Sequence, residues 1–293
     1  MTGSVAAMKI IEVKKLPSAI ALNLGALRSS SKRNVAVEAL PEITYVRPSV
    51  TIDAKRVKAY AKVCGFTEAH GVPMLVPHMD AFPLAMMLFG SKAFPWPAMG
   101  LVHLANSAKL LKRINVGDKL RIEVRTGELY KHDKGQVFTL HVRALRDGVV
   151  VWESTWTLLR MGVKQPRGPE YVSQINDERP LAHQADFFAG AGIGRSYGRV
   201  SGDVNPIHLS ALTAKFLGFK EPIAHGMWTK ARALAVLMPR EAVDQAEVIV
   251  EFKTPLFLPA RASLWANRGE GEAIFEVRNA KGDKPHLRGQ VRY

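Results

Sequence analysis

Two short runs in the second half of the chain combine residue types that acid–base chemistry needs. The first, SGDVNPIH at residues 201–208, sets the carboxylate of Asp203 and the imidazole of His208 five positions apart across a Gly/Asn/Pro turn. A turn of this composition can bring both side chains to one side. An imidazole has a pKa near working pH, so an Asp/His pair that shares one water suits general acid–base catalysis, worth roughly 10²–10⁴-fold in rate.

The second run, AHGM at residues 224–227, places Gly226 at the expected start of a helix. A glycine amide there has no side chain in its way, and the helix dipole favours negative charge at that end. One such donor to an oxyanion is worth roughly 10²–10³-fold. Together with Asp203 and His208, this amide suits the addition of water to, or its removal from, a bond next to a carbonyl.

Each of these residues has a simpler interpretation when taken alone. Asp203 is more often a turn or capping residue, and His208 a half-buried structural histidine. Asn205 is most simply a residue that closes the turn, and for His225 a role as a buttress of the turn is equally open. Only the ordered combination favours chemistry. Six other histidines lack such company and are assigned no role: His70, His103, His132, His141, His183 and His286.

Length and composition bound the class of protein. The 293 residues suffice for about two domains, and 47% hydrophobic with 23% charged residues are typical of a globular protein. The single cysteine, Cys64, excludes an internal disulfide and fits a reducing, cytoplasmic compartment. No Cys/His cluster has zinc spacing, so we expect no metal. No apolar run approaches the ~20 residues that a membrane span needs.

The charge balance favours polyanionic partners. Lys and Arg number 41 against 26 Asp and Glu, which gives a formal net charge of +15. The basic residues are scattered among apolar segments and form no long run, so we do not expect nucleic acid as the partner. A phosphorylated carrier such as coenzyme A, or an acidic carrier protein, fits the charge equally well.

The two halves of the chain repeat each other at low fidelity. YAKVCG at residues 60–65 matches YGRVSG at residues 197–202, and Asp53 can cap the helix that leads into the first copy. Residues 185–191 offer a similar short segment before the second copy. Long apolar helices are expected near residues 78–88 and 226–237. The expected strands are 100–111, 117–129, 136–146, 149–160, 246–254, 260–268, 272–279 and 286–293.

A long helix followed by antiparallel strands favours a sheet that wraps around the helix and covers its apolar surface. We therefore predict an α+β fold with two antiparallel sheets, each around one long central helix. The predicted divisions are a frayed or lightly structured leader at 1–44, a first domain at 45–163, a Pro/Gly-rich linker at 164–170 and a second domain at 171–293. We expect the Met and aromatic side chains of residues 74–99 to be core more than ligand wall.

The differences between the two halves indicate that they have different functions. The second copy holds about ten more residues between Gly202 and His225 than the first copy holds between Gly65 and His78, and these include DVNPIH. Phe66 stands where the second copy has Asp203, and Met79 stands where it has Gly226. The second half therefore has candidate functional residues at positions where the first half has apolar side chains.

Residues 197–208, with AHGM at 224–227, closely resemble the signature of the MaoC-like R-specific enoyl-CoA hydratase (hydratase 2) and (3R)-hydroxyacyl dehydratase family. The helix and strand pattern extends the resemblance to double hotdog members. The first half, with PHMDAFP at 77–83 and GLVH at 100–103, is similar to their degenerate N-terminal hotdog. The resemblance implies a double hotdog fold with the catalytic site in the C-terminal hotdog.

The resemblance also implies roles for single residues. Asp203 and His208 would be the catalytic pair, and the Gly226 amide would bind the thioester oxygen. The residues Asn205, Ser201 and His225 would support the pair. The substrate would be a trans-2-enoyl or (3R)-3-hydroxyacyl thioester of coenzyme A or acyl carrier protein, in fatty acid metabolism, with no cofactor. The first half would supply room for the acyl chain.

Two other functions fit the same fold. A hotdog acyl thioesterase would bind the same substrates but release a free thiol, and a non-catalytic subunit would bind acyl thioesters without turnover. Monomer and homodimer are both compatible with two hotdogs in one chain. Acyl chain length, the carrier and the physiological direction do not follow from the sequence.

Overall fold

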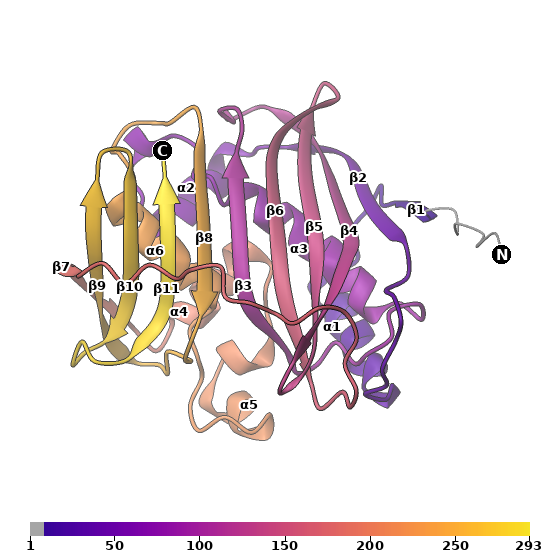
Figure 1. Ribbon diagram of the computed structural model, residues 1–293. Helices are drawn as coiled ribbons and strands as arrows, with labels where there is room; N and C mark the ends of the chain where they lie inside the picture. The colour runs from indigo at the N-terminus through magenta and orange to yellow at the C-terminus, as the bar shows by residue number, and fades with distance from the viewer. Residues whose placement is uncertain (1–8) are drawn as a thin grey trace.

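The computed structural model describes residues 9–293, which form one continuous sheet of 11 strands with helices against one face (Figure 1). The strands are β1 (Lys9–Glu12), β2 (Ile43–Thr51), β3 (Leu101–Leu110), β4 (Lys119–His132), β5 (Gly135–Arg146), β6 (Val149–Met161), β7 (Ala182–Ala189), β8 (Ala246–Phe252), β9 (Ala260–Gly269), β10 (Glu272–Asn279) and β11 (Pro285–Arg292). The helices are α1 (Ala19–Arg28), α2 (Ala54–Cys64), α3 (Val76–Gly90), α4 (Ile193–Ser201), α5 (Ala211–Phe216) and α6 (Gly226–Leu237). Short 3-10 turns are η1 (Ser29–Ser31), η2 (Glu68–His70) and η3 (Pro206–His208).

Each half of the sheet belongs to one half of the chain and covers one long helix. The strand order is β1-β2-β4-β5-β6-β3-β8-β11-β10-β9-β7, with α3 behind the first group and α6 behind the second (Figure 1). Both helices are largely buried, and a helix that is apolar on most sides needs such cover. The expected α+β double hotdog fold is confirmed.

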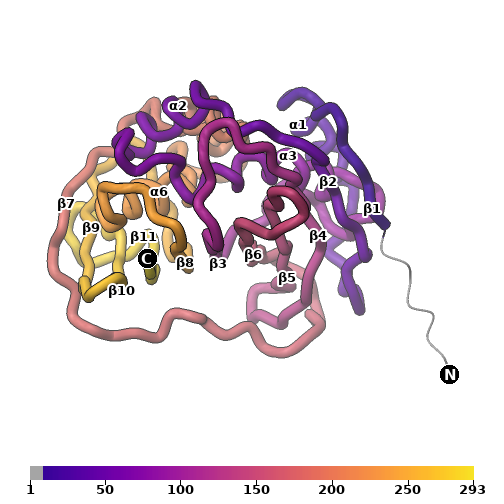
Figure 2. Tube along the Cα trace, turned by 90° about the horizontal axis from the view of Figure 1, so that it is seen from above, coloured from indigo at the N-terminus to yellow at the C-terminus, as the bar shows by residue number. Residues whose placement is uncertain are grey.

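The two halves join at the pairing of β3 with β8. This ladder is antiparallel and runs from Ala105 opposite Glu251 to Leu110 opposite Ala246. It merges the two half-sheets into one, so side chains near the start of β3 can face the functional residues of the second half. The connection from β6 to β7 crosses the face of the sheet opposite the helices (Figure 2). The expected linker, 164–170, lies at the start of this connection.

The repeated sequence motif forms a pair of equivalent helices. The side chain of Asp53 accepts a hydrogen bond from the Arg56 amide at the start of α2, as expected for an N-cap. α2 and α4 both end at a glycine in the left-handed conformation, which avoids the steric cost that a side chain would bring. The helices pack together, and the rings of Tyr60 and Tyr197 lie 6.2 Å apart.

The expectation of a lightly structured leader is wrong for residues 9–44; residues 1–8 lie outside the described part of the chain. β1 pairs in parallel with β2, and α1 packs against α3. The Ser18 side chain caps α1 by accepting a hydrogen bond from the Ala21 amide. The leader is ordered because apolar side chains along one face of α1 pack against α3 in the first half of the fold.

Residues 185–191 differ from expectation as well. They belong mainly to β7, an edge strand paired with β9, and the helix before the second glycine begins only at Ile193. Pairing with β9 across a whole strand outweighed the weak local preference for a helix. Within residues 9–293, no helix is both long and apolar enough to cross a membrane.

Candidate active site

The turn after α4 holds Asp203 in place. α4 ends at Gly202, whose φ of +82° is accessible to glycine at little cost. The Asp203 amide donates to Ser201 Oγ at 3.2 Å, and the Asn205 amide donates to Asp203 Oδ1 at 3.2 Å. Asn205 Oδ1 in turn accepts from the Ile207 amide at 3.3 Å and caps η3. The first two bonds position Asp203, the second of them at its carboxylate, and the third leads the chain into His208.

His208 is held in one tautomer by a backbone carbonyl. Its Nδ1 lies 2.7 Å from the carbonyl oxygen of Ile223. A carbonyl only accepts, so Nδ1 carries the proton and Nε2 of the neutral ring has the free lone pair. His208 is buried, with 8% of its surface accessible, so its ring has little freedom to turn.

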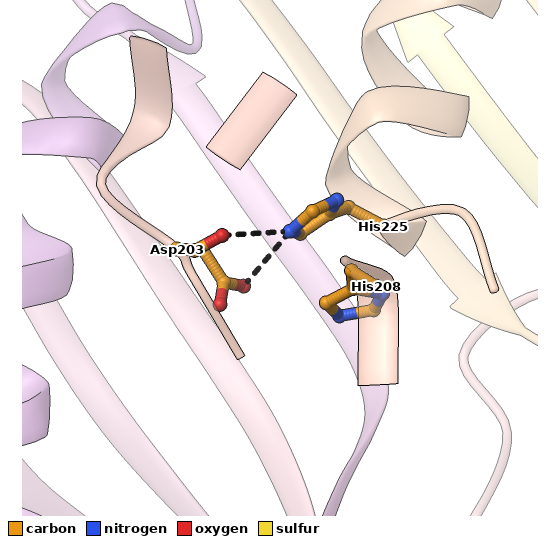
Figure 3. A group of neighbouring side chains, drawn as sticks. All are labelled: Asp203, His208 and His225. Carbon is orange, nitrogen blue, oxygen red and sulfur yellow. Dashed lines mark hydrogen bonds and ion pairs between the residues drawn. The ribbon is translucent and has the colours of Figure 1, made fainter. Parts of the chain in front are cut away.

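His225 supports this pair from behind. Its Nε2 donates to the backbone carbonyl oxygen of Asp203 at 2.9 Å and lies 3.8 Å from the Asp203 carboxylate (Figure 3). Its ring stacks on the His208 ring with centroids 3.7 Å apart. Among the described residues, its buried Nδ1 has no hydrogen-bond partner. His225 therefore contacts both members of the pair and supports the turn, which is one of the two roles that the sequence analysis left open for it.

Asp203 and His208 are close enough to share a water. One oxygen or nitrogen from each of Asp203, His208 and His225 lies within 4.8 Å of the others. Burial raises the pKa of Asp203, an effect that nearby His208 opposes, and burial lowers the pKa of His208, which Asp203 opposes. The two pKa values move toward each other, which makes the carboxylate a better base and the imidazolium a better acid.

The same three residues are a poor set of metal ligands. His208 Nδ1 and His225 Nε2 already contact backbone carbonyls, and His225 Nδ1 is fully buried. Only the Asp203 carboxylate and His208 Nε2 remain to face the cavity, whereas a protein metal site usually supplies three or more ligands. The geometry suits proton transfer better than metal binding.

Gly226 begins α6 at the edge of the same site. As the first residue of the helix, it has no partner for its amide inside the helix. A methyl group on Gly226 would lie 2.6 Å from Cε1 of Phe252, so only glycine fits without a shift of the ring. The free amide and the positive end of the helix dipole both favour an oxyanion here.

Asp203, His208, His225 and Gly226 all line one cavity of about 430 Å³ that extends into the first half of the fold. Its apolar walls there include Phe82, Met86, Phe89, Trp156 and Leu158. The expectation that the Met and aromatic side chains of residues 74–99 are core more than ligand wall therefore holds only in part. Among these side chains, Met74, Met79, Phe94 and Trp96 are buried and do not line the cavity.

Three histidines to which the sequence analysis gave no role in the site line the cavity, namely His78, His103 and His286. His103 stands at a β-bulge between His103 and Ala105, a feature that re-aims side chains near active sites. Burial and nearby Lys230 lower its pKa to about 3, against the opposing effect of Asp203. No local motif marks His103, because the β3–β8 ladder alone brings it to the second half.

A buried lysine lies beneath His103. Lys230 follows Gly226 by one helical turn and is fully buried, and its Nζ donates to Asn106 Oδ1 at 2.7 Å and to the Asn106 carbonyl oxygen at 3.1 Å. The Asn106 side-chain amide donates to His103 Nε2 at 3.5 Å. Burial holds the pKa of Lys230 well below its usual 10.5. This chain of contacts ties α6 to β3 across the seam.

Comparison with known proteins agrees with this fold. Residues 193–288 match the family model described as MaoC like domain. The chain is 34% identical over 254 residues to 3-hydroxyacyl-thioester dehydratase X of Mycobacterium tuberculosis, covering 86% of this chain and 90% of that protein. The crystal structure of HtdX from that organism superposes with a TM-score of 0.73 at 32% identity, over 85% of this chain and 99% of that one.

A more distant structure shows the fold alone. A conserved hypothetical protein from Mycobacterium tuberculosis, described as having a double hotdog fold, matches with a TM-score of 0.51 at 12% identity, over 84% of this chain and 93% of that one. Fold and comparisons thus define a double hotdog enzyme of the dehydratase class. The chain belongs to the MaoC-like dehydratase family, and its class of reaction is that of a hydro-lyase.

Proposed function

We propose that this protein interconverts (3R)-3-hydroxyacyl and trans-2-enoyl thioesters by removing or adding water, in fatty acid metabolism. The observation that carries the proposal is the placement of Asp203, His208 and the Gly226 amide on the wall of one largely apolar cavity. The name of the Mycobacterium tuberculosis relative supports a 3-hydroxyacyl thioester as the substrate class.

In the hydration direction, the Asp203 carboxylate and His208 Nε2 hold one water between them. The water oxygen attacks C3 of the enoyl group while the pair takes one of its protons. The electron pair of the double bond moves to C2 and the thioester oxygen, and the Gly226 amide stabilises the resulting enolate. The pair then returns the proton to C2, so H and OH are both added. Dehydration follows the same steps in reverse.

The supporting residues keep this pair in the productive arrangement. Ser201 and Asn205 fix the Asp203 loop, and His225 bonds to the Asp203 backbone while it stacks on the His208 ring. Neither hydroxyl nor amide needs to touch substrate for this role. We propose that the apolar cavity in the first half takes the acyl chain.

The remaining assignments rest on composition. The net charge of +15 supports a thioester of coenzyme A or acyl carrier protein, both of which are anionic. The single thiol, Cys64, is buried and unpaired, which supports a cytoplasmic location. The β3–β8 ladder already joins two hotdogs within one chain, which suits a monomer or a homodimer.

Two assays on the same trans-2-enoyl-CoA separate this function from its rivals. We expect the enoyl absorbance to fall as water is added, with (3R)-3-hydroxyacyl-CoA as the product and no free thiol by a thiol reagent. Thiol release at a comparable rate would instead make the protein a thioesterase. Binding with neither change would make it a non-catalytic acyl-thioester-binding subunit.

A further inference from the structure

The leader helix α1 presents one of its faces to the cavity. The residues on that face are Ala19, Leu22, Asn23 and Ala26, which all line the cavity. Their spacing of i, i+3, i+4 and i+7 is that of a single helical stripe. On other faces of the same helix, Ile20 is 74% exposed and Leu24 is 47% exposed. The contact with the cavity is therefore specific to one face of α1.

α1 lies in the half of the molecule remote from the acid–base pair. Both views place it beside α3 on the β2–β4 side (Figures 1 and 2), whereas α4 and α6 lie behind the other half-sheet (Figure 1). The crossing with α3 is close, since a methyl group on Gly90 would lie 3.2 Å from the carbonyl carbon of Gly25. Without side chains between them, the two helices can bring the α1 stripe against the cavity.

Several hydrogen bonds fasten the chain after α1 to the end of α3 and the loop beyond it. Lys32 Nζ donates to the carbonyl oxygens of Ser91 and Phe94 at 2.6 and 2.7 Å. Ser29 Oγ accepts from the Ala98 amide at 2.8 Å, and Trp96 Nε1 donates to the Val35 carbonyl oxygen at 2.8 Å. These bonds hold α1 as a fixed wall, so its side chains determine how far the cavity extends.

We propose that α1 forms the end wall of the acyl subsite and sets the longest acyl chain that the enzyme accepts, with Leu22 as the main determinant. The inference rests on the proposed function, because it assumes an acyl thioester in the cavity. Leu22 is the one bulky apolar side chain of the stripe; the two alanines are small and the Asn23 amide nitrogen bonds to the Ala19 carbonyl oxygen. Side-chain volume at position 22 therefore changes the space at the far end most directly.

The test compares Leu22 with Leu24, a matched leucine on the exposed side of the same helix. For Leu22→Trp, kcat/KM for crotonyl-CoA should stay within about twofold of wild type. For longer enoyl-CoA substrates it should fall about fourfold for each methylene that loses its buried position. Leu22→Ala should shift the profile toward longer chains. The control variants Leu24→Trp and Leu24→Ala should leave the profile unchanged.

Calorimetric binding of saturated acyl-CoA, from butyryl to palmitoyl, gives a second readout that needs no turnover. It should show the same dependence on chain length as the rates. If the wild type hydrates no enoyl thioester, the proposed function fails. The binding data would still test whether α1 limits the length of the acyl chain. The proposal is refuted if Leu22→Trp changes kcat/KM and affinity by the same factor at every chain length, or leaves both unchanged. It is also refuted if Leu24→Trp produces the same shift as Leu22→Trp.

Discussion

His208 Nδ1 donates to the carbonyl oxygen of Ile223 at 2.7 Å. The carbonyl of Ile223 is fixed in turn, because the Ile223 amide donates to the Ile207 carbonyl oxygen at 3.1 Å and the next residue, Ala224, bonds to Leu256. The acceptor that selects the tautomer is thus part of the backbone and is not a titrating carboxylate. As a result, Nε2 of the neutral His208 ring is available to accept a proton from water.

The first prediction concerns the pH dependence of hydration. The active form has Asp203 ionised and His208 neutral, so kcat/KM should fall as pH drops through the pKa of Asp203. Burial raises that pKa above 3.8 and lowers the pKa of His208 below 6.5. The acid limb should therefore be centred above 3.8, the ordinary pKa of an aspartate. A limb centred at or below 3.8, measured with a substrate that does not itself titrate, would contradict the assignment.

The second prediction concerns Gly226→Ala. The added methyl group would meet the Phe252 ring at 2.6 Å, so the start of α6 or the ring must move. Alanine keeps the backbone amide, but a shift of the start of α6 displaces it from the oxyanion, which should reduce kcat by about 10²-fold or more with a smaller effect on KM. The matched control is Gly190→Ala, whose methyl group would have only an ordinary 3.6 Å contact and should leave rates unchanged. Wild-type kcat in a Gly226→Ala variant whose crystal structure shows the amide displaced would remove the amide from the mechanism.

Much of the fold and of the site could be predicted because the relevant signals are local. The cap at Asp53, the glycine at the end of α2 and the hairpin at Asp147-Gly148 depend only on neighbouring residues. In that hairpin both residues have positive φ, as the Asp-Gly pair indicates. The DVNPIH run likewise brings Asp203 and His208 together within one turn.

The rest depends on contacts between segments far apart in the chain. His103 reaches the cavity only through the β3–β8 ladder, and nothing near it in sequence indicates this. α1 has a weak apolar stripe that includes Asn23, and its stability comes from α3, which begins 48 residues after α1 ends. Tertiary packing of this kind overrides local propensity.

The third prediction concerns the buried amine of Lys230. Its pKa is far below 10.5 in the folded state, so the unfolded chain binds more protons and the free energy of unfolding should rise with pH. The contribution should approach ~1.4 kcal/mol per pH unit where the amine is neutral when folded and charged when unfolded. Lys230→Met should remove this slope, as followed by urea denaturation across neutral to alkaline pH. Lys109→Met, at a half-exposed site, should not; equal slopes in all three proteins would contradict the prediction.

The central claim is that Asp203 and His208 carry the chemistry, and two near-isosteric variants test it directly. The matched controls are Asp186→Asn and His183→Gln, since Asp186 and His183 form an Asp/His contact at 2.9 Å outside the cavity. All four variants should unfold close to the wild-type midpoint.

The decisive measurement is the rate of enoyl-CoA hydration by Asp203→Asn and His208→Gln beside these controls. The account predicts that each active-site variant loses at least about 10²-fold in kcat, while both control variants keep wild-type rates. Near wild-type rates in both Asp203→Asn and His208→Gln would contradict it.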